Sequence, residues 1–284
     1  MGTNLLSAIA NLVDDPITDI VPHYRSTNRV NSMGEALEFY VKDLFCDSLR
    51  ETNATTRNRI YSEHFSYIGN EINPPDFMIK QGDAIEVKKI ESLRTDIALN
   101  SSYPKDKIYS SSPMITAECR DCENWDEKDL IYAIGVPIER KLKVLWFIHG
   151  SCYAAGKETY ERVRDQISSG INELPNVELS ETTELGRVNR VDPLGITYLR
   201  VRGMWGIKNP IRVFEQIASV NTEDDLSLNA IMLKEKYLSF PEEDRRKIES
   251  LISENLTVED VELPSPNNPA NLLDAKIIKF RRVI

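Results

Sequence analysis

Three side chains in the segment 73–91, NPPDFMIKQGDAIEVKKIE, are of types that together can hold a metal ion and hydrolyse a phosphate ester: Asp76, Glu86 and Lys88. Mg²⁺ prefers oxygen ligands, keeps several waters, and is typically held by one or two carboxylates together with phosphate oxygens. A lysine beside such an ion can orient the attacking water and offset the charge that builds on the phosphate oxygens. The set therefore predicts Mg²⁺-dependent phosphodiester hydrolysis, with Asp76 and Glu86 as metal ligands and Lys88 positioning the nucleophile.

These residues meet only if the segment folds back on itself as a β-hairpin. Residues 77–90 read as a short apolar strand, a turn that contains Gly82, and a second strand that alternates apolar and charged side chains. Alternation puts Glu86 and Lys88 on one face of that strand, with Cα atoms about 7 Å apart given a rise of ~3.3 Å per residue. Asp76, at the start of the first strand, then lies beside Glu86.

A plain alternative exists for this pattern. Alternating charges on a strand usually form a solvated face, and Asp followed by Glu-x-Lys is short enough to arise often by chance. The hairpin context and the Pro-Pro-Asp entry at residues 74–76 favour the functional interpretation. Hydrolysis would then proceed by in-line attack of a metal-bound water on the phosphorus.

The same residues carry a family resemblance. Pro75-Asp76 and Glu86-Val87-Lys88 resemble the PD-(D/E)xK signature of restriction-endonuclease-like nucleases. Over roughly residues 1 to 215 the chain resembles the NgoPII-type family of type II restriction endonucleases. The matching blocks are residues 28–45, the NPPD and AIEVKK pieces, ALNSSYPK at 98–105, DLIYAIG at 129–135 and LRVRGMW at 199–205.

The resemblance implies both a fold and an activity. The fold is α/β and restriction-endonuclease-like, with a central mixed β-sheet flanked by α-helices and the active site at the hairpin. The activity is Mg²⁺-dependent cleavage of double-stranded DNA at the palindrome GGCC, leaving blunt ends with a 5′-phosphate and a 3′-hydroxyl.

A helix that begins near residue 33 adds a fourth candidate for the active site. Ser32 is a suitable N-cap with Glu35 at the capping-box position, and apolar residues recur at helical spacing over residues 37–45. Glu38 lies next to that apolar stripe. In nucleases that this chain resembles, a helix with a glutamate at this place lies against the catalytic sheet. The alternative for Glu38 is a solvated helix residue.

The segment 100–105 offers small hydrogen-bonding groups followed by an amine. Its candidate DNA-contacting residues are Asn100, Ser101, Ser102 and Lys105. Such groups suit contacts to phosphates or base edges. They equally suit an ordinary turn, and it is the family resemblance that favours DNA binding.

A second set of candidate DNA-contacting residues lies at about 185–212. It comprises Arg187, Asn189, Arg190, Arg200 and Arg202. Residues 197–201 alternate as a strand, which puts Arg200 and Arg202 on one face. Because arginine bonded to O6 and N7 of guanine is the commonest specific major-groove contact, a G·C-only target would need such side chains. A salt-bridged surface strand is the alternative.

The charge balance agrees with a selective DNA enzyme but does not identify one. A formal net charge of −10 argues against indiscriminate binding to nucleic acid. The arginines above, together with Lys208 and Arg212, could build a local basic surface with few acids between them. The acidic remainder would repel DNA from the other faces of the molecule.

Length and composition indicate an ordinary globular protein. The chain has 284 residues, 41% of them hydrophobic and 28% charged, which suits one large domain and excludes a disordered chain. No apolar run reaches membrane-spanning length, and the first residues lack the basic and long apolar parts of a secretory signal. Four cysteines suit a reducing compartment. We expect a cytoplasmic protein.

A change of composition after residue 220 suggests two regions. Residues 1–220 would form the nuclease core with its DNA-recognition elements, and residues 221–284 a helical extension packed on that core. Residues 226–256 read as helices interrupted at Pro241, and residues 272–284 as a final strand.

The partners expected are double-stranded DNA, a second copy of the chain and, genetically, a cognate DNA methyltransferase. A two-fold homodimer meets a palindrome most simply, because each subunit reads one half-site and cuts one strand. Two other functions stay open: a structure-directed nuclease of repair or recombination, and a non-catalytic DNA-binding module. The complete Asp-Glu-Lys set argues against the module.

Overall fold

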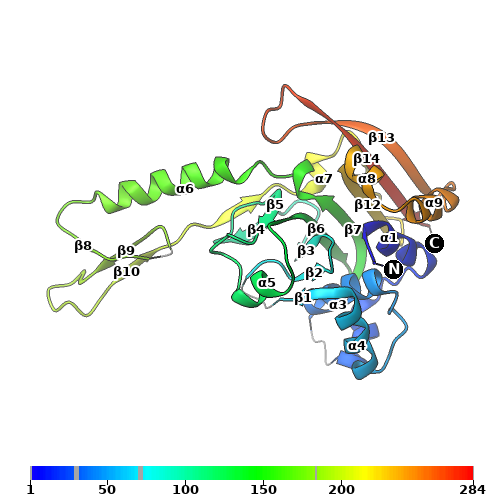
Figure 1. Cartoon of the computed structure of the whole chain (residues 1–284), viewed down its shortest axis with the longest axis horizontal. Coiled ribbons are helices and arrows are strands. Elements are labelled where there is room, and N and C mark those ends of the chain that lie inside the picture. The colour runs from blue at the N-terminus through cyan, green and yellow to red at the C-terminus, as the bar shows by residue number, and fades with distance from the viewer. Residues whose placement is uncertain (1, 29–31, 70–72, 183, 284) are drawn as a thin grey trace.

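A computed structural model describes residues 2–28, 32–69, 73–182 and 184–283. Residues 29–31, in the first block that carries the family resemblance, lie outside the described residues. Figure 1 shows a globular body from which a long arm projects. None of the helices that the structure describes combines the length and the apolar character needed to cross a membrane.

A mixed β-sheet of nine strands forms the centre of the described body. Eight of them follow the order β1-β2-β3-β6-β7-β12-β14-β13, and β5 pairs with β6 beside that path. The strands are β1 (Phe65–Ile68), β2 (Phe77–Ile79), β3 (Ala84–Lys89), β5 (Lys107–Tyr109), β6 (Glu127–Ile138), β7 (Lys141–His149), β12 (Leu226–Leu233), β13 (Leu256–Pro264) and β14 (Leu272–Arg282). Pairs β3–β6 and β7–β12 are parallel and the other pairs are antiparallel, which confirms the predicted fold class.

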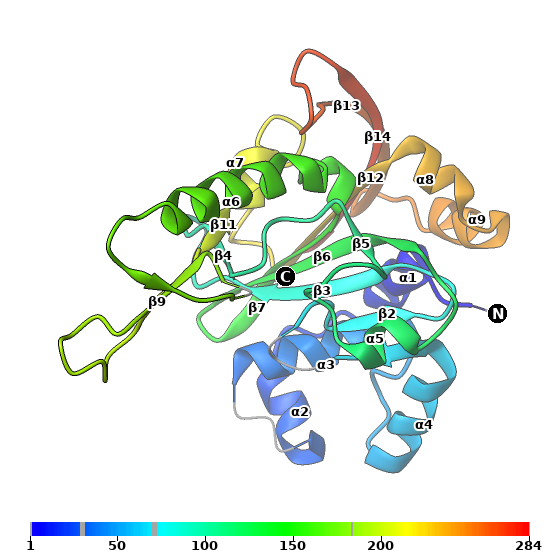
Figure 2. The ribbon, with the colours of Figure 1, turned by 60° about the vertical axis from the view of Figure 1, so that its left-hand side comes forward.

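Each face of the sheet is covered by its own hydrophobic layer. On one face lie α1 (Leu5–Asp14), α2 (Ile20–Asn28), α3 (Met33–Cys46), α4 (Ala54–His64), α8 (Lys234–Ser239) and α9 (Glu242–Ser250). On the other lie β4 (Ile97–Asn100), α5 (Ala117–Asp121), the 3₁₀ turn η1 (Gly150–Cys152) and α7 (Pro210–Val213). Figure 2 shows α2, α3 and α4 on the opposite side of the sheet from α7.

The elements around the candidate site form for local reasons that the sequence displays. Ser32 and Glu35 make the predicted capping box at the start of α3, and the apolar stripe at residues 37–45 is buried. The predicted hairpin is present as β2 and β3, whose inward-facing Phe77 and Ile85 stand opposite each other in register and are fully buried. The hairpin is therefore fixed by packing against α3 as well as by its own hydrogen bonds.

The C-terminal region differs from its prediction. Residues 226–233, expected to be helical, form strand β12, and helices occur only after it, in α8 and α9. β12 pairs in parallel with β7 and antiparallel with β14. The sheet thus continues without interruption across the boundary expected near residue 220.

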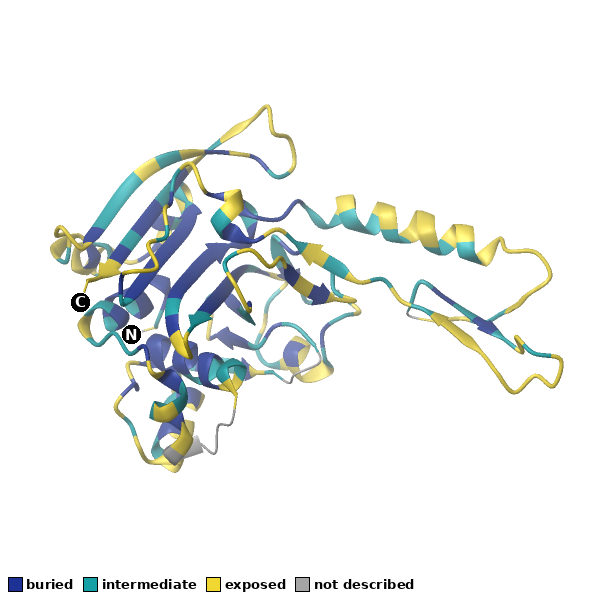
Figure 3. Cartoon of the chain, turned by 180° about the vertical axis from the view of Figure 1, so that it is seen from behind, coloured by how far each residue is buried: buried dark blue, intermediate teal, exposed yellow. Residues whose placement is uncertain are grey.

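The projecting arm is built from one helix and short strands. It comprises α6 (Lys157–Asn172), β8 (Glu178–Leu179), β9 (Gly186–Asn189) and β10 (Leu199–Val201), and the chain returns to the body through β11 (Trp205–Ile207), which pairs with β4. α6 has no fully buried residue, and Leu194, Ile196 and Met204 are largely exposed. Figure 3 shows the contrast between this exposed arm and the buried strands of the body.

Candidate active site

The hairpin brings the predicted carboxylates together. The backbone N–H of Asp76 donates to the carbonyl of Ile85 at 3.0 Å, and the backbone N–H of Val87 donates to Asp76 Oδ2 at 2.6 Å. Asp76 is thereby held against the stretch of β3 that carries Glu86. Two hydrogen bonds fix its position, so the carboxylate does not depend on a ligand to find its place.

Glu86 and Lys88 lie on the same face of β3, as alternation predicts. Lys88 Nζ is 2.6 Å from Glu86 Oε1, and both side chains are mostly shielded from solvent. The other oxygen, Glu86 Oε2, is buried and has no hydrogen-bond partner. A buried carboxylate oxygen without a donor is costly unless a ligand satisfies it. Lys89 pairs instead with Glu91.

The charged groups of the site shift one another's protonation. Burial and the neighbouring Glu86 raise the pKa of Asp76 to about 7, against the opposing effect of Lys88. For Lys88, burial disfavours the charged amine, but Glu86 and Asp76 outweigh burial and raise its pKa. The negative charge of the two carboxylates is therefore only partly balanced by the protein, which makes the site attractive to a cation.

Glu38 reaches the same site from α3, which packs on β3. Its charge contributes to the raised pKa of both Asp76 and Lys88, so it lies within electrostatic reach of them. Its Oε1 atom is 2.6 Å from Nζ of Lys42, one helical turn further on. One oxygen of Glu38 is therefore paired within its own helix.

The donor set suits Mg²⁺. Within the described residues, no group of three or more His, Cys, Asp or Glu side chains is arranged to hold a metal ion. Asp76 and the unpartnered oxygen of Glu86 are the carboxylate groups that the hairpin brings together, and they stay candidates for metal ligands. Two carboxylates fit an ion that takes its other ligands from water and phosphate, and they do not fit a structural zinc site.

Tyr132 connects the site to the segment at residues 100–105. On β6 it stands directly beside Glu86 in the parallel register. Its buried hydroxyl accepts a hydrogen bond from the backbone N–H of Lys105 at 2.7 Å and donates to the carbonyl of Lys105 at 3.2 Å. The loop that carries Lys105 is therefore fastened to the face of the sheet on which Glu86 lies.

The four candidate residues of this loop have different surroundings. Asn100 ends β4 and is exposed, as is Ser101, whereas Ser102 is half-buried. Lys105 is buried, and its amine donates to Ser102 Oγ and to the carbonyl of Tyr103. Burial lowers the pKa of Lys105 to about 8, even though Glu86 pulls in the opposite direction.

The second set of candidate DNA contacts lies on the arm, away from the hairpin (Figure 1). Arg200 and Arg202 do lie together, because both pair with Glu184. β10 ends at Val201, however, so Arg202 follows the strand instead of belonging to it. In this arrangement the pair has the salt-bridged surface character that was the alternative for this stretch.

The other candidate DNA-contacting residues of the arm also have partners within the protein. Arg187 donates to Asn189 Oδ1 at 3.2 Å, and its guanidinium lies 4.7 Å from the centre of the Tyr198 ring. Arg190 is 3.5 Å from Glu178. The fold nevertheless brings acids to these arginines from outside that stretch, since Glu178 and Glu184 pair with three of them.

Comparisons with known proteins show the family to which the chain belongs. The model of the NgoPII restriction endonuclease family matches residues 3–264. The chain is also 46% identical over 278 residues to "Type II restriction enzyme NgoPII" of Neisseria gonorrhoeae, covering 98% of this chain and 99% of that protein. The chain belongs to the NgoPII restriction endonuclease family. No solved structure matches it significantly.

Membership of the NgoPII family makes the chain a type II restriction enzyme, a site-specific deoxyribonuclease that acts on double-stranded DNA. The match reaches well past residue 215, where the resemblance seen in the sequence ended, and takes in β12 and β13. This extent agrees with the C-terminal strands being part of the central sheet.

The sequence interpretation missed one residue of the site's framework. Tyr132 was part of the DLIYAIG block and of a predicted strand, but its place beside Glu86 depends on how β3 and β6 align. A tyrosine in an otherwise apolar strand is the only signal that could have drawn attention to it, because a buried hydroxyl needs a partner.

Proposed function

We propose that this type II restriction endonuclease cuts double-stranded DNA at the palindrome GGCC with Mg²⁺, leaving blunt ends with a 5′-phosphate and a 3′-hydroxyl. The observation that carries the proposal is the convergence of Asp76, Glu86 and Lys88 on one hairpin in a chain of this family. The target and the ends are those expected from the family resemblance.

Each residue has a separate task in the proposed reaction. Asp76 and Glu86 bind the metal, with Glu86 Oε2 as the oxygen that lacks any other partner. Lys88 holds the attacking water in line with the scissile bond and offsets charge on the phosphate oxygens. Glu38 supports the site from α3 through its charge. A bound Mg²⁺ supplies Lewis acidity and lowers the pKa of coordinated water.

Recognition is proposed to involve both candidate sets. Asn100, Ser101, Ser102 and Lys105 contact the DNA next to the hairpin, and Arg187, Asn189, Arg190, Arg200 and Arg202 contact it from the arm. To read guanines, Arg200 and Arg202 must break their ion pairs with Glu184 and form hydrogen bonds to the base edges instead. Such an exchange favours the correct sequence, because a wrong base leaves the arginines with a better partner in Glu184.

The proposed setting is that of a restriction–modification system in the cytoplasm. A homodimer reads the two halves of the palindrome, and a cognate methyltransferase protects the same sequence in the cell's own DNA. The dimer follows from the symmetry of the target.

Digestion of a sequenced plasmid with purified protein and Mg²⁺ tests the proposal. Discrete fragments that end within GGCC are expected, because only a sequence-specific enzyme produces them. A smear would indicate a structure-directed nuclease instead, and fragments with other ends would overturn the GGCC assignment alone.

Adjacent lysines provide a matched pair of variants for the catalytic roles. Lys88→Ala is expected to slow cleavage at least about 100-fold, because a charge that stabilises the transition state is lost. Lys89→Ala, one residue on and paired with Glu91, should stay within about 3-fold of the wild-type rate. Single-turnover cleavage rates measure both. Wild-type cutting by Lys88→Ala or by Asp76→Ala would rule out the assigned site.

A further inference from the structure

We infer that a hollow beside the catalytic hairpin binds a second phosphate of the DNA backbone, away from the bond that is cut, through Lys157 and Lys105. The inference rests on the proposed function and adds a binding site to it. The hollow lies between the start of α6 and residues 103–115, and its cavity volume of about 80 Å³ is enough for one phosphate group.

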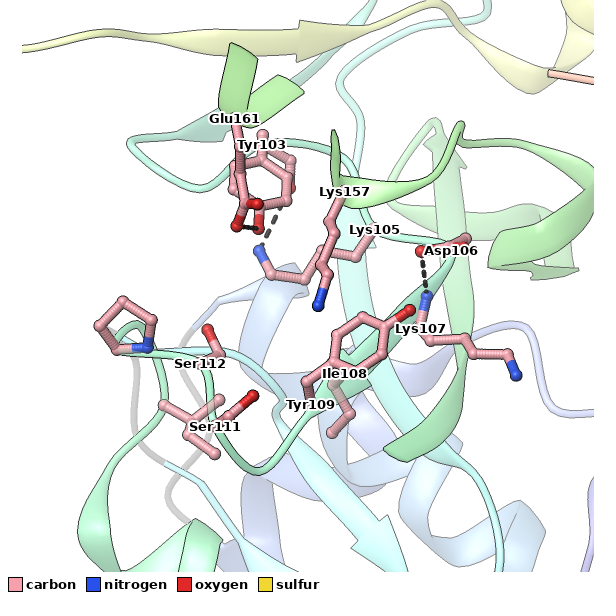
Figure 4. A pocket seen from close by; sticks show the side chains of 12 residues that line it. Tyr103, Lys105, Asp106, Lys107, Ile108, Tyr109, Ser111, Ser112, Lys157 and Glu161 are labelled. Carbon is pink, nitrogen blue, oxygen red and sulfur yellow. Dashed lines mark hydrogen bonds between the residues drawn. The ribbon is translucent and has the colours of Figure 1, made fainter. Parts of the chain in front are cut away.

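Three lysines line this hollow, together with hydroxyl groups. Figure 4 shows Lys157 reaching in from α6 above the ring of Tyr109, while Ser111 and Ser112 lie on the opposite wall. The Lys157 amine is 4.1 Å from the centre of that ring. An amine over an aromatic face, with serine hydroxyls across from it, is a suitable environment for an anion that accepts several hydrogen bonds.

Two of the three lysines have no acidic partner. Lys107 pairs with Glu127 at 2.6 Å. In contrast, neither Lys157 nor Lys105 is within ion-pair distance of any carboxylate in the described parts of the chain. Lys105 is also buried, and a buried amine that has no counter-ion is costly to maintain. Both amines therefore line the hollow without a carboxylate in ion-pair contact.

The two acids of the hollow form no ion pair with Lys157 or Lys105. Asp106 accepts a hydrogen bond from the backbone N–H of Lys107 at 2.8 Å. Glu161 accepts one from the hydroxyl of Tyr103 at 3.0 Å. Both carboxylates are thus directed to neighbouring donors, and neither pairs with Lys157 or Lys105.

The position of the hollow identifies which anion it receives. Lys105 is fastened by Tyr132 to the strand next to Glu86, so one wall of the hollow is also a wall of the catalytic centre. A DNA strand whose phosphate lies at the hairpin presents further phosphates on either side. We therefore assign the hollow to a phosphodiester of the bound strand rather than to a free metabolite.

A methylphosphonate scan tests this assignment directly. Single phosphates of a GGCC duplex are replaced, one at a time, by neutral methylphosphonates, and affinity is measured by fluorescence anisotropy without divalent metal. Replacement of the phosphate at one position near the cut is expected to weaken binding to the wild-type protein about 5-fold, because one charge contact is lost. In Lys157→Gln the same replacement should cost nothing, because the contact is already absent.

The salt dependence of binding gives a second readout. Lys157→Gln should lower the slope of log affinity against log salt concentration by about 0.9, the value for one phosphate contact. Lys157→Arg keeps the charge and should keep the slope. The exposed Lys247, on α9, provides the control, and Lys247→Gln should leave both affinity and slope unchanged.

The outcomes separate this inference from the proposed function. If no methylphosphonate position depends on Lys157 while the wild-type enzyme still cuts, the hollow does not hold a backbone phosphate and only this inference fails. A second outcome would also overturn this inference. Millimolar inorganic phosphate could compete with DNA for the wild type but not for Lys157→Gln, while the scan finds no position that depends on Lys157. The hollow would then bind free phosphate. Wild-type protein that neither binds nor cuts DNA would overturn the proposed function itself.

Discussion

At the scale of single residues, the ionised carboxylate of Asp76 is destabilised by its surroundings in the protein without a metal ion. It is buried next to Glu86 and also feels the charge of Glu38, while the amine of Lys88 contacts Glu86. Like charges in a low-dielectric environment disfavour ionisation. A divalent cation relieves this repulsion, so metal affinity and apo-state stability oppose each other here.

The first prediction concerns Asp76→Asn without divalent metal. Because the pKa of Asp76 is about 7 in the folded protein and its ordinary value is 3.8, the folded state binds a proton between these values that the unfolded chain does not. The free energy of unfolding of the wild type therefore falls as pH rises through this interval. The amide has no charge and can still accept the hydrogen bond from Val87.

Urea unfolding at pH 5 and pH 8 checks this prediction. Asp76→Asn should exceed the wild type by about 1–3 kcal/mol at pH 8, with a smaller difference at pH 5, and should lose cleavage. Adding Mg²⁺ should stabilise the wild type and not the variant. A variant less stable than the wild type at pH 8 would mean that Lys88 already balances the carboxylate.

At the scale of elements, the loop before β5 is held in place by close packing as well as by Tyr132. A Cβ on Gly150 would meet the carbonyl oxygens of Lys105 and Asp106 far inside contact distance. Tyr103 of the same loop stacks on Tyr160 of α6, which in turn meets Trp205 at the root of the arm. The loop is thus clamped between the sheet and the arm.

The second prediction uses this contact. Gly150→Ala must push the loop away, because backbone atoms cannot yield as a side-chain end does, and should cost about 1–3 kcal/mol of stability and slow cleavage at least about 10-fold. Gly170→Ala in α6 meets nothing within 4 Å and should be neutral or stabilising by up to about 1 kcal/mol. Urea unfolding and single-turnover kinetics measure both. Equal behaviour of the two variants would contradict the clamp.

The elements that could be predicted are those whose cause is local. The hairpin follows from a turn and an alternating strand, and α3 from a capping box and an apolar stripe. β12 was mistaken for a helix because both of its faces are buried, and residues 230–233 form an apolar run that suits a buried helix as well as a buried strand.

The residues of the candidate site also divide into those that local sequence predicts and those that depend on contacts between distant segments. Asp76, Glu86 and Lys88 were predictable because one hairpin holds all three. The place of Lys105 was not, since it depends on Tyr132, whose position beside Glu86 is set by a parallel pairing between strands distant in sequence. The acidic partner of Arg200 and Arg202 could not be anticipated either, because Glu184 reaches them only when the chain folds back at β9 and β10.

At the scale of the whole molecule, a compact sheet carries the candidate chemistry and a thin arm carries most of the arginines considered for recognition (Figure 1). The overall charge of −10 leaves such local basic groups to decide where DNA approaches. A single copy has one candidate active site, whereas cutting both strands of a palindrome needs two.

The last prediction is that two chains bind each target duplex. Sedimentation velocity without divalent metal should show two protein chains on a duplex that contains one GGCC site, because each half-site is read by one copy. A duplex of equal length without the site should show weaker, salt-sensitive binding. A complex of one chain with one GGCC duplex would contradict the homodimer.

The order of strands in the sheet has a consequence for how the enzyme is made. β14 is the last strand in the sequence, yet it lies between β12 and β13 and pairs with both. A ribosome that stops before residue 272 releases a chain in which these two neighbours keep unpaired edges, the kind of surface that leads to aggregation. A DNA-cutting protein built in this order completes its scaffold only after β14 has been made.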